Sequence, residues 1–372
     1  MSTLPKTKYR ADEVPNCMLW LIGIGINGYK GISIYALDIL KRCDMIYIER
    51  FTSALSDYDL QGLNVLIRKN DNKVIIPIER WFVEDGREIL EEAKNRNIAI
   101  LTYGDPLVAT TLTELHVRAV KRSIKVNIIH SASGITSLIG ETGLHIYKFG
   151  RTVTMMSEFK STISVYNTIF DNLLTGNHTL ILTEYNNNHN KLFFLDPIYV
   201  FKSLLEVEKD LNYRAFSDGT FIVVASRVGS EQQKIVSGKV KSLIQTDFGL
   251  GPHSIIITGL LHFTESDALK TLTYNIDEPL DNSLNIQKVS INMVGKYAPK
   301  AKYAIEQMKS IIRSENNTSA NKRSIEVLDN AEYYVNDAER FLKQGKLELA
   351  VLSIGYAEGL IDAVRFQKEI NP

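Results

Sequence analysis

Three glycines with the spacing G-x-G-x-x-G stand near the beginning of the chain, directly after an apolar run. They are Gly23, Gly25 and Gly28 in the stretch LWLIGIGINGYKG (residues 19–31), and Glu49 ends the next apolar run. This order is typical of the βαβ unit that binds dinucleotides, in which the glycines bring backbone amides close to a pyrophosphate. It raises the hypothesis of a nicotinamide- or flavin-dependent oxidoreductase, or of a non-catalytic nucleotide-binding module.

The residues after the glycines argue against a dinucleotide site. In that fold the helix begins within the glycine motif, so that its first amides face the pyrophosphate. Here Tyr29, Lys30 and Gly31 follow the third glycine, and Ser33 is the first good helix N-cap. The loop is therefore several residues too long. Glu49 is better explained as an acidic residue at the end of a strand.

Two further loops carry small and polar residues after apolar runs. In LTYGDPLVATT (101–111), Asp105 is predicted at a helix N-cap and Pro106 at the first helical position. In HSASGITS (130–137), Ser133 is predicted to cap the next helix. Loops at the carboxyl ends of parallel strands meet at one edge of the sheet, so these loops can share a pocket with the glycine loop. Backbone and small side chains would meet the ligand there, which suits S-adenosylmethionine better than NAD.

The elements that must hold these loops alternate between strand and helix. Residues 18–25 form a predicted buried strand, and helices are predicted over 33–43, 83–97 and 106–123. A second alternating segment contains predicted helices near 160–174 and 196–209, and it closes with the strand-rich stretch GPHSIIITGLLHF (251–263). This alternation favours an α/β fold with a largely parallel sheet.

Beyond about residue 280 the pattern changes to that of helices alone. Small and large apolar residues recur every three or four positions on both sides of Gly345, which predicts an antiparallel helical hairpin with Gly345 at the break. Gly355 and Gly359 lie one turn apart, so they serve either simple helix packing or close approach of a partner. The predicted organisation is a mobile tail (1–17), two α/β domains (18–158 and 159–280) and a helical domain (281–372).

Composition excludes several classes of protein. The 372 residues include 43 Lys and Arg and 43 Asp and Glu, so no net basic charge indicates a nucleic-acid partner. Cys17 and Cys43 fit neither a metal spacing nor a disulfide framework, which favours a reducing cytoplasm. No apolar run is long enough to span a bilayer. We therefore expect a cytoplasmic protein without a metal site, a membrane segment or a direct nucleic-acid partner.

Six motifs in order resemble the diphthine synthases, methyltransferases of the tetrapyrrole-methylase superfamily. The motifs lie between about residues 18 and 265 and read LWLIGIGI, GDPLVATT, SASGITS, GLHIYKFGRTVT, ASRVGS and PHSIIITGLLHF. GDP alone marks only the superfamily, whereas GDPLVATT together with IYKFG is typical of diphthine synthase. The resemblance implies two α/β domains with S-adenosylmethionine in the cleft between them, and the helical domain resembles an archaeal addition of unknown role.

The resemblance also implies which residues contact the methyl donor. Two positions depart from the family pattern: Tyr185, in a stretch where the family usually has Leu-Asp, and Gly134, where the family commonly has Ile. No general base is identified, and Lys148 could face the substrate or be a solvated charge. The residues expected at the donor are Ile26, Asp105, Val108, Ser133, Gly134, Tyr185, Val228 and His253.

The substrate that the resemblance implies is elongation factor 2 carrying a 3-amino-3-carboxypropyl group on one histidine. The expected reaction is successive methylation of the amine to the trimethylammonium product, diphthine, by a homodimeric enzyme. Methylation of a corrinoid precursor by another member of the superfamily is the alternative.

Overall fold

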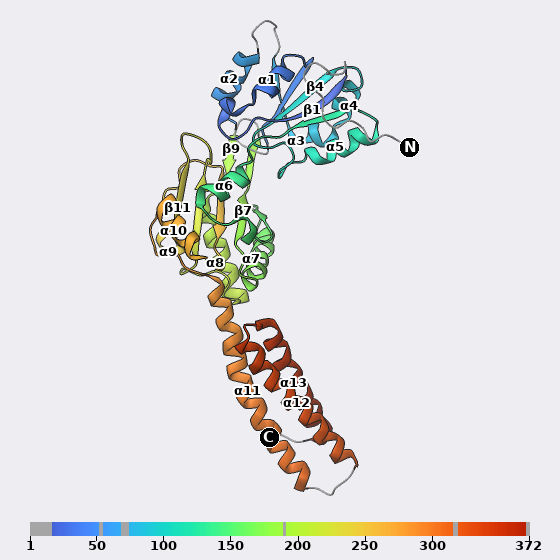
Figure 1. Ribbon diagram of the computed structural model, residues 1–372, viewed down its shortest axis with the longest axis vertical. Coiled ribbons are helices and arrows are strands. Elements are labelled where there is room, and N and C mark those ends of the chain that lie inside the picture. The colour runs from blue at the N-terminus through green and yellow to red at the C-terminus, as the bar shows by residue number, and fades with distance from the viewer. Residues whose placement is uncertain (1–16, 52–54, 68–73, 189–190, 315–318, 370–372) are drawn as a thin grey trace. The chain divides into compact units, whose positions relative to one another are not determined.

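The computed structural model describes the chain except for residues 1–16, 52–54, 68–73, 189–190, 315–318 and 370–372 (Figure 1). Almost all of the predicted mobile tail, residues 1–17, therefore lies outside the described residues. The chain divides into two compact units. The core unit consists mainly of residues 1–281, and the helical unit consists of residues 282–372 with the short segments 173–175 and 212–215.

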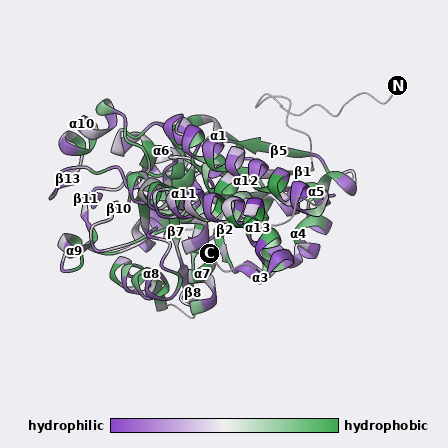
Figure 2. Cartoon of the chain, turned by 90° about the horizontal axis from the view of Figure 1, so that it is seen from below, coloured by the Kyte–Doolittle hydropathy of each residue, from purple (hydrophilic) through white to green (hydrophobic). Residues whose placement is uncertain are grey.

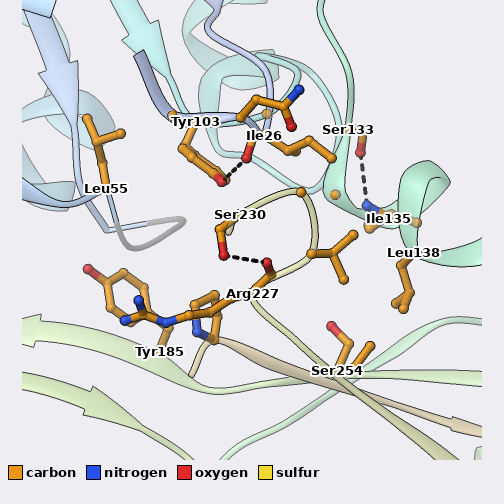
Figure 3. A pocket seen from close by; sticks show the side chains of 18 of the residues that line it. Ile26, Leu55, Tyr103, Ser133, Ile135, Leu138, Tyr185, Arg227, Ser230 and Ser254 are labelled. Carbon is orange, nitrogen blue, oxygen red and sulfur yellow. Dashed lines mark hydrogen bonds between the residues drawn. The ribbon is translucent and has the colours of Figure 1, made fainter. Parts of the chain in front are cut away.

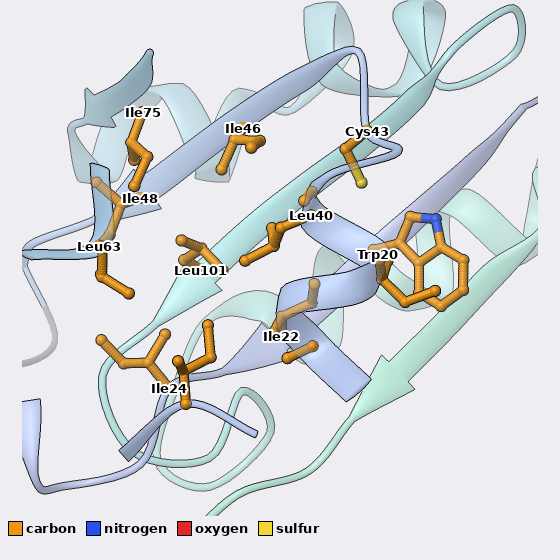
Figure 4. Close-up of a cluster of buried hydrophobic side chains, with 14 of the residues drawn as sticks. Trp20, Ile22, Ile24, Leu40, Cys43, Ile46, Ile48, Leu63, Ile75 and Leu101 are labelled. Atoms are coloured by element: carbon orange, nitrogen blue, oxygen red, sulfur yellow. The ribbon is translucent and has the colours of Figure 1, made fainter. Parts of the chain in front are cut away.

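The first sheet of the core unit is parallel throughout, as the alternation of strand and helix predicts. Its order is β3-β2-β4-β1-β5, and both β1 and β4 are buried along their whole length. Successive side chains of β1 enter opposite cores. Trp20 and Ile22 lie in one of them (Figure 4), and Leu19 and Leu21 lie in the other. The strands are β1 (Met18–Gly23), β2 (Met45–Glu49), β3 (Ile75–Ile78), β4 (Asn97–Thr102) and β5 (Val126–Ile129).

Two of the predicted helices around this sheet differ in the structure, and α2 (Asp57–Ile67) was not predicted. The helix predicted over 83–97 is broken at Gly86, which has φ +58° and packs so closely on Leu115 that a Cβ there would lie 2.6 Å from its side chain. The helix predicted from residue 106 begins only at Leu112, because the intervening residues form turns and Ala109 has φ +56°. The helices of this part are α1 (Ile34–Leu40), α2 (Asp57–Ile67), α3 (Arg80–Asp85), α4 (Arg87–Glu92), α5 (Leu112–Lys121) and α6 (Gly134–Thr142), with short 3-10 turns at Gly28–Gly31 and Ile146–Lys148.

The second sheet is mixed rather than parallel. Its order is β13-β11-β10-β12-β7-β6, with β10 antiparallel to both β11 and β12. It includes β6, which precedes the predicted domain boundary at 158, and Leu138 of α6 also packs into its core. The strands are β6 (Val153–Met155), β7 (Thr179–Thr183), β10 (Phe221–Ser226), β11 (Lys234–Lys239), β12 (His253–Ile257) and β13 (Tyr274–Asn275), beside the hairpin β8 (Tyr185–Asn188) and β9 (Lys191–Phe194).

Helices complete this second layer. The stretch 251–263, predicted to be rich in strand, contributes only β12 and then runs into α10, whose first turn is capped by His262 and Glu265. In Figure 2 strands such as β2, β5 and β7 are coloured as hydrophobic, whereas α3 is largely hydrophilic, as expected for buried strands under solvent-facing helices. The helices are α7 (Phe159–Leu174), α8 (Pro197–Leu211), α9 (Val240–Leu243) and α10 (Phe263–Leu272).

The helical unit contains the predicted hairpin and one helix more. Gly345, with φ +72°, separates α12 (Ser319–Lys343) from α13 (Leu347–Lys368), and α11 (Ser283–Ser314) packs on both. Apolar residues of all three helices share one core, and Lys309 of α11 pairs with Asp329 and Glu332 of α12 at 2.7 and 2.6 Å. No atom lies within 4 Å of a Cβ built at Gly355 or Gly359. Among the described residues, no other segment of backbone therefore packs closely against these glycines.

Candidate functional site

A cavity of about 910 Å³ lies in the core unit, and loops from both sheets line it (Figure 3). Loops that follow β1, β4 and β5 provide one side. The other side comes from the ends of β7, β10 and β12 and from the β8–β9 hairpin. Its size is in the range of small-molecule and cofactor sites, and its place beyond the carboxyl ends of parallel strands is where α/β sheets bind ligands.

The three loops on the first side meet at Gly23. A Cβ there would lie 2.5 Å from the Gly104 carbonyl oxygen, 2.9 Å from Pro106 Cδ and 2.9 Å from Ser131 Cβ. The backbones of Gly25 and Gly104 also exchange hydrogen bonds of 3.2 and 2.9 Å. The first glycine of the motif is therefore required by the packing of protein on protein, and the predicted meeting of these loops is confirmed.

Gly28, the third glycine of the motif, makes room for a carboxylate. A Cβ at Gly28 would lie 2.0 Å from Asp59 Oδ1, and that oxygen accepts a 3.0 Å hydrogen bond from the Tyr29 backbone. In a dinucleotide site the third glycine lets the following helix pack closely on the strand, whereas here Gly28 begins a 3-10 turn that ends at Gly31. The loop after β1 therefore lacks the helix start that a dinucleotide site requires, which argues against the oxidoreductase hypothesis.

Asp105 is not the helix N-cap that its position before proline predicts. Its Oδ1 accepts from the Leu107 backbone at 3.0 Å, and its Oδ2 contacts His130 Nδ1 at 2.8 Å and the Ser131 backbone at 3.2 Å. The carboxylate is buried and ties the loop after β4 to the loop after β5. The prediction of a helix start failed because Asp105 serves two loops rather than a helix end.

The loop after β5 agrees with its predicted geometry. Ser133 caps α6 by accepting a hydrogen bond from the Ile135 backbone at 3.3 Å. Gly134 follows at the cavity wall, and no atom lies within 4 Å of a Cβ built on it. The absence of a side chain at this position leaves the cavity wider there, as the departure from the family pattern predicts.

On the second side of the cavity, a polar pair and a packed loop position the lining residues. His253 contacts the Ser226 hydroxyl through Nδ1 at 2.8 Å, and burial lowers the pKa of this histidine, so the ring is neutral near pH 7. The loop that carries Val228 packs on Ile26, because a Cβ at Gly229 would lie 2.5 Å from the Ile26 side chain. Tyr185 donates a 2.9 Å hydrogen bond to the Arg50 carbonyl oxygen.

All eight residues expected at the methyl donor line this one cavity. They are Ile26, Asp105, Val108, Ser133, Gly134, Tyr185, Val228 and His253. The structure brings them together from positions spread over more than two hundred residues of sequence. Their contacts with a ligand stay a prediction.

Several lining residues were missed from the sequence. Tyr103 donates a short hydrogen bond to the Ile26 carbonyl oxygen, and its pKa is raised to about 12, chiefly by burial. Asp59 and Arg227 also line the cavity. Tyr103 directly precedes the GDP stretch and could have been suspected, whereas no local signal indicates that Asp59 lies near Gly28.

Lys148 belongs to a different cluster. Its Nζ contacts the carboxylate of Glu265 and the Leu260 carbonyl oxygen, and neither charged residue lines the cavity. Glu265 is fully buried and also accepts from His178 Nε2 at 3.0 Å. The predicted alternative of a solvated charge is therefore wrong, whereas a contact of Lys148 with a protein substrate stays a prediction. The lysine neutralises an acid in the interior.

Two classes of site receive no support among the described residues. No group of three or more His, Cys, Asp or Glu side chains is placed to hold a metal ion within the described ranges. None of the described helices is both long enough and apolar enough to cross a membrane.

Comparison with known proteins gives one family match in the core unit and another in the helical unit. A family model described as Tetrapyrrole (Corrin/Porphyrin) Methylases matches residues 18–244, and a model for a family of unknown function (DUF357) matches residues 296–370. The chain is 38% identical over 262 residues to a protein named diphthine synthase from Methanocaldococcus jannaschii, covering 70% of this chain and 100% of the relative.

Two further relatives extend the comparison. A Dictyostelium discoideum protein named diphthine methyl ester synthase is 33% identical over 68% of this chain and 97% of its own length. The crystal structure of a putative diphthine synthase from Entamoeba histolytica matches with a TM-score of 0.62 and 33% identity, covering 69% of this chain and 99% of that structure.

Proposed function

Because the chain belongs to the tetrapyrrole methylase family, we propose that it is the S-adenosylmethionine-dependent methyltransferase of diphthamide biosynthesis. Its substrate is then elongation factor 2 that carries a 3-amino-3-carboxypropyl group on a histidine, and the acceptor atom is the amine of that group. The observation that carries the proposal is the convergence of the eight expected residues on one cavity of ligand size.

The residues present fit S-adenosylmethionine. The cavity is walled by glycines and small residues that let a nucleoside approach backbone, and Gly134 leaves space in which a side chain would stand. Asp105 would hold the loops against the donor, with Ile26 and Val228 as apolar contacts and neutral His253 as a polar one.

When bound, S-adenosylmethionine supplies a methyl group on a sulfonium, already activated for in-line displacement. The protein's task is to align the amine lone pair with the sulfur–methyl bond and to exclude water. Positioning of this kind contributes roughly 7–11 kcal/mol to lowering a barrier. The amine must be neutral when it attacks, so each transfer releases one proton.

We further propose three transfers to the same nitrogen, a homodimeric enzyme and a cytoplasmic location. The first two rest on the resemblance to archaeal diphthine synthases, and the third on the location of the elongation factor and on the free cysteines. Methylation of a corrin precursor is the competing activity within the same family.

A transfer assay tests the proposal. The full-length chain is incubated with labelled S-adenosylmethionine and purified elongation factor 2 that carries the 3-amino-3-carboxypropyl group, with the unmodified factor as control. We expect label in the modified factor only. Label in neither protein, together with transfer to a corrin precursor, would overturn the proposal in favour of the competing activity.

A further inference from the structure

The cavity has a part that the eight expected donor residues do not account for. The residues that line the cavity there are Tyr29, Tyr58, Asp59, Tyr103 and Arg227. Two opposite charges, Asp59 and Arg227, thus face one cavity. Both side chains are half-buried.

Arg227 has no acidic partner among the described residues. Its Nε donates to the Gly251 carbonyl oxygen at 2.9 Å and its Nη1 donates to Gln232 Oε1 at 2.5 Å, and both acceptors are neutral. A guanidinium offers five N–H donors and matches a carboxylate in a bidentate manner. In a cavity that receives a sulfonium and an amine, an arginine is electrostatically unfavourable unless an anion binds beside it.

Asp59 is the acidic counterpart of Arg227 in the same cavity. Its Oδ1 accepts from the Tyr29 backbone at 3.0 Å and its Oδ2 accepts from the Ser56 hydroxyl at 2.5 Å. No ion pair joins it to a basic side chain in the part of the chain that the structure describes. The rings of Tyr29 and Tyr58 lie edge to face beside it, with centroids 5.8 Å apart. A carboxylate next to aromatic faces is a favourable environment for an ammonium group.

Tyr103 lies near enough to both charges to respond to them. Its hydroxyl lies in the same cavity as Arg227 (Figure 3). Besides burial, the charge of Asp59 raises the pKa of Tyr103 and the charge of Arg227 lowers it, so both charges act on one hydroxyl. Asp59 and Arg227 therefore line one cavity in the vicinity of the Tyr103 hydroxyl.

We propose that Asp59 and Arg227 form a subsite for an α-amino-acid group, with Arg227 on its carboxylate and Asp59 on its ammonium or methylated amine. The acceptor's 3-amino-3-carboxypropyl group has this chemistry, and so does the methionyl end of the donor. We assign the subsite to the acceptor, because the lining residues expected at the donor are distinct from it. This assignment rests on the proposed function. Arg227 and Asp59 act as positioning residues, since they orient the amine toward the methyl group without taking part in bond exchange.

The test separates binding of the acceptor from binding of the donor. Calorimetry, with S-adenosylhomocysteine present, measures the affinity of the full chain for modified and for unmodified elongation factor 2. The wild type is expected to prefer the modified factor, and Arg227→Gln is expected to lose roughly ten- to hundredfold of that preference. KM for the modified factor should rise accordingly, with the Kd of S-adenosylhomocysteine changed less than about twofold.

Two pairs of matched variants identify the cause of the lost preference. Gln232→Ala removes the partner that orients the guanidinium but keeps its charge, so its effect is expected to be smaller than that of Arg227→Gln. Asp59→Asn should raise KM more than Glu231→Gln, which removes an equal charge from the wall of the same cavity. Equal effects within either pair would overturn the proposal, because the loop or the net charge would then explain the loss.

Three further outcomes separate failure of the subsite from failure of the proposed function. If Arg227→Gln weakens S-adenosylhomocysteine binding and leaves the preference for the modified factor intact, the subsite belongs to the donor and the assignment is wrong. If the wild type itself shows neither preference nor methyl transfer, the proposed function fails as well. If the wild type prefers the modified factor and Arg227→Gln does so equally, the subsite alone is refuted.

Discussion

Asp105 and Glu265 are both buried carboxylates that accept backbone N–H groups and contact a histidine, yet they lie in different surroundings. Asp105 stands in the wall of the cavity and joins two loops, with a histidine that is 64% exposed. Glu265 lies away from the cavity. Its oxygens accept from the backbones of His145 and His262 at 2.9 and 2.8 Å, and from two side chains.

The difference between them teaches how to separate a structural charge from a functional one. His178 Nδ1 accepts from the Gly259 backbone at 2.8 Å, so its Nε2 carries the proton that it donates to Glu265. Every partner of Glu265 is thus supplied by the protein, with no access for a ligand. Asp105 is equally satisfied, but the loops that it joins form the cavity. A cluster of titratable groups therefore indicates a functional site only where it borders a cavity that a ligand can enter.

The strongest way to test this contrast is to remove the charge of Glu265. Glu265→Gln leaves Lys148 without its acid in the interior, which should lower the free energy of unfolding by about 3 kcal/mol. Urea denaturation measures this change. Asp267→Asn, at an exposed position of the same helix, is the control and should alter stability by less than about 0.5 kcal/mol. Equal stabilities of the two variants would show that the cluster does not support the fold.

The pH dependence of stability sharpens the same assignment. Burial alone would raise the pKa of Glu265, but hydrogen bonds from His178, Lys148 and two backbone groups outweigh it and lower the pKa below its usual value. The stabilisation is then complete above the unfolded-state pKa of about 4.3 and is lost as the pH falls below it. The difference in the free energy of unfolding between the wild type and Glu265→Gln should therefore shrink as the pH falls from 7 to 3. A constant difference across this range would contradict the assignment.

On the cavity side, the expected loss is one of donor affinity rather than of stability. Asp105→Asn keeps the size of the side chain but places an N–H donor opposite backbone donors, so the two loops should separate. Affinity for S-adenosylmethionine in calorimetry should fall roughly tenfold or more. His130→Ala removes one partner of Asp105 and leaves its backbone hydrogen bonds, so a smaller loss is expected. Unchanged affinity in Asp105→Asn would leave this residue with a purely local role.

The smallest effect is expected at Gly134. A Cβ there meets no atom within 4 Å, so Gly134→Ala should change the Kd for S-adenosylmethionine less than about threefold and leave unfolding unaltered. Gly23→Ala is the contrast, because its Cβ would meet the Gly104 carbonyl oxygen at 2.5 Å. A large loss of donor affinity in Gly134→Ala would show that the ligand itself fills this space.

Much of the fold followed from periodicity. The parallel first sheet, α7, α8 and the α12–α13 hairpin have strongly patterned apolar residues, and their existence was predicted. The mixed second sheet was not, because a strand carries no local signal for the direction of its neighbour. The break at Gly86 and the late start of α5 depend on positive φ at Gly86 and Ala109, which tertiary packing selects.

The site was predictable where motifs exist and hidden where only the fold brings residues together. The residues expected from the resemblance all reached the cavity. Asp59 and Arg227 did not attract notice, because one lies in an ordinary helix start and the other between a strand and a turn. The glycine motif located the right loop, but Gly23 and Gly28 serve contacts with protein rather than with a pyrophosphate.

Mass spectrometry of elongation factor 2 after incubation with the chain and S-adenosylmethionine tests the proposed activity most directly. Starting from the 3-amino-3-carboxypropyl-modified factor, we expect a gain of three methyl groups on the modified histidine and no gain on the unmodified factor. Fragmentation should place all three on the amine nitrogen. A modified factor of unchanged mass, or methyl groups on any other residue, would contradict the proposed function.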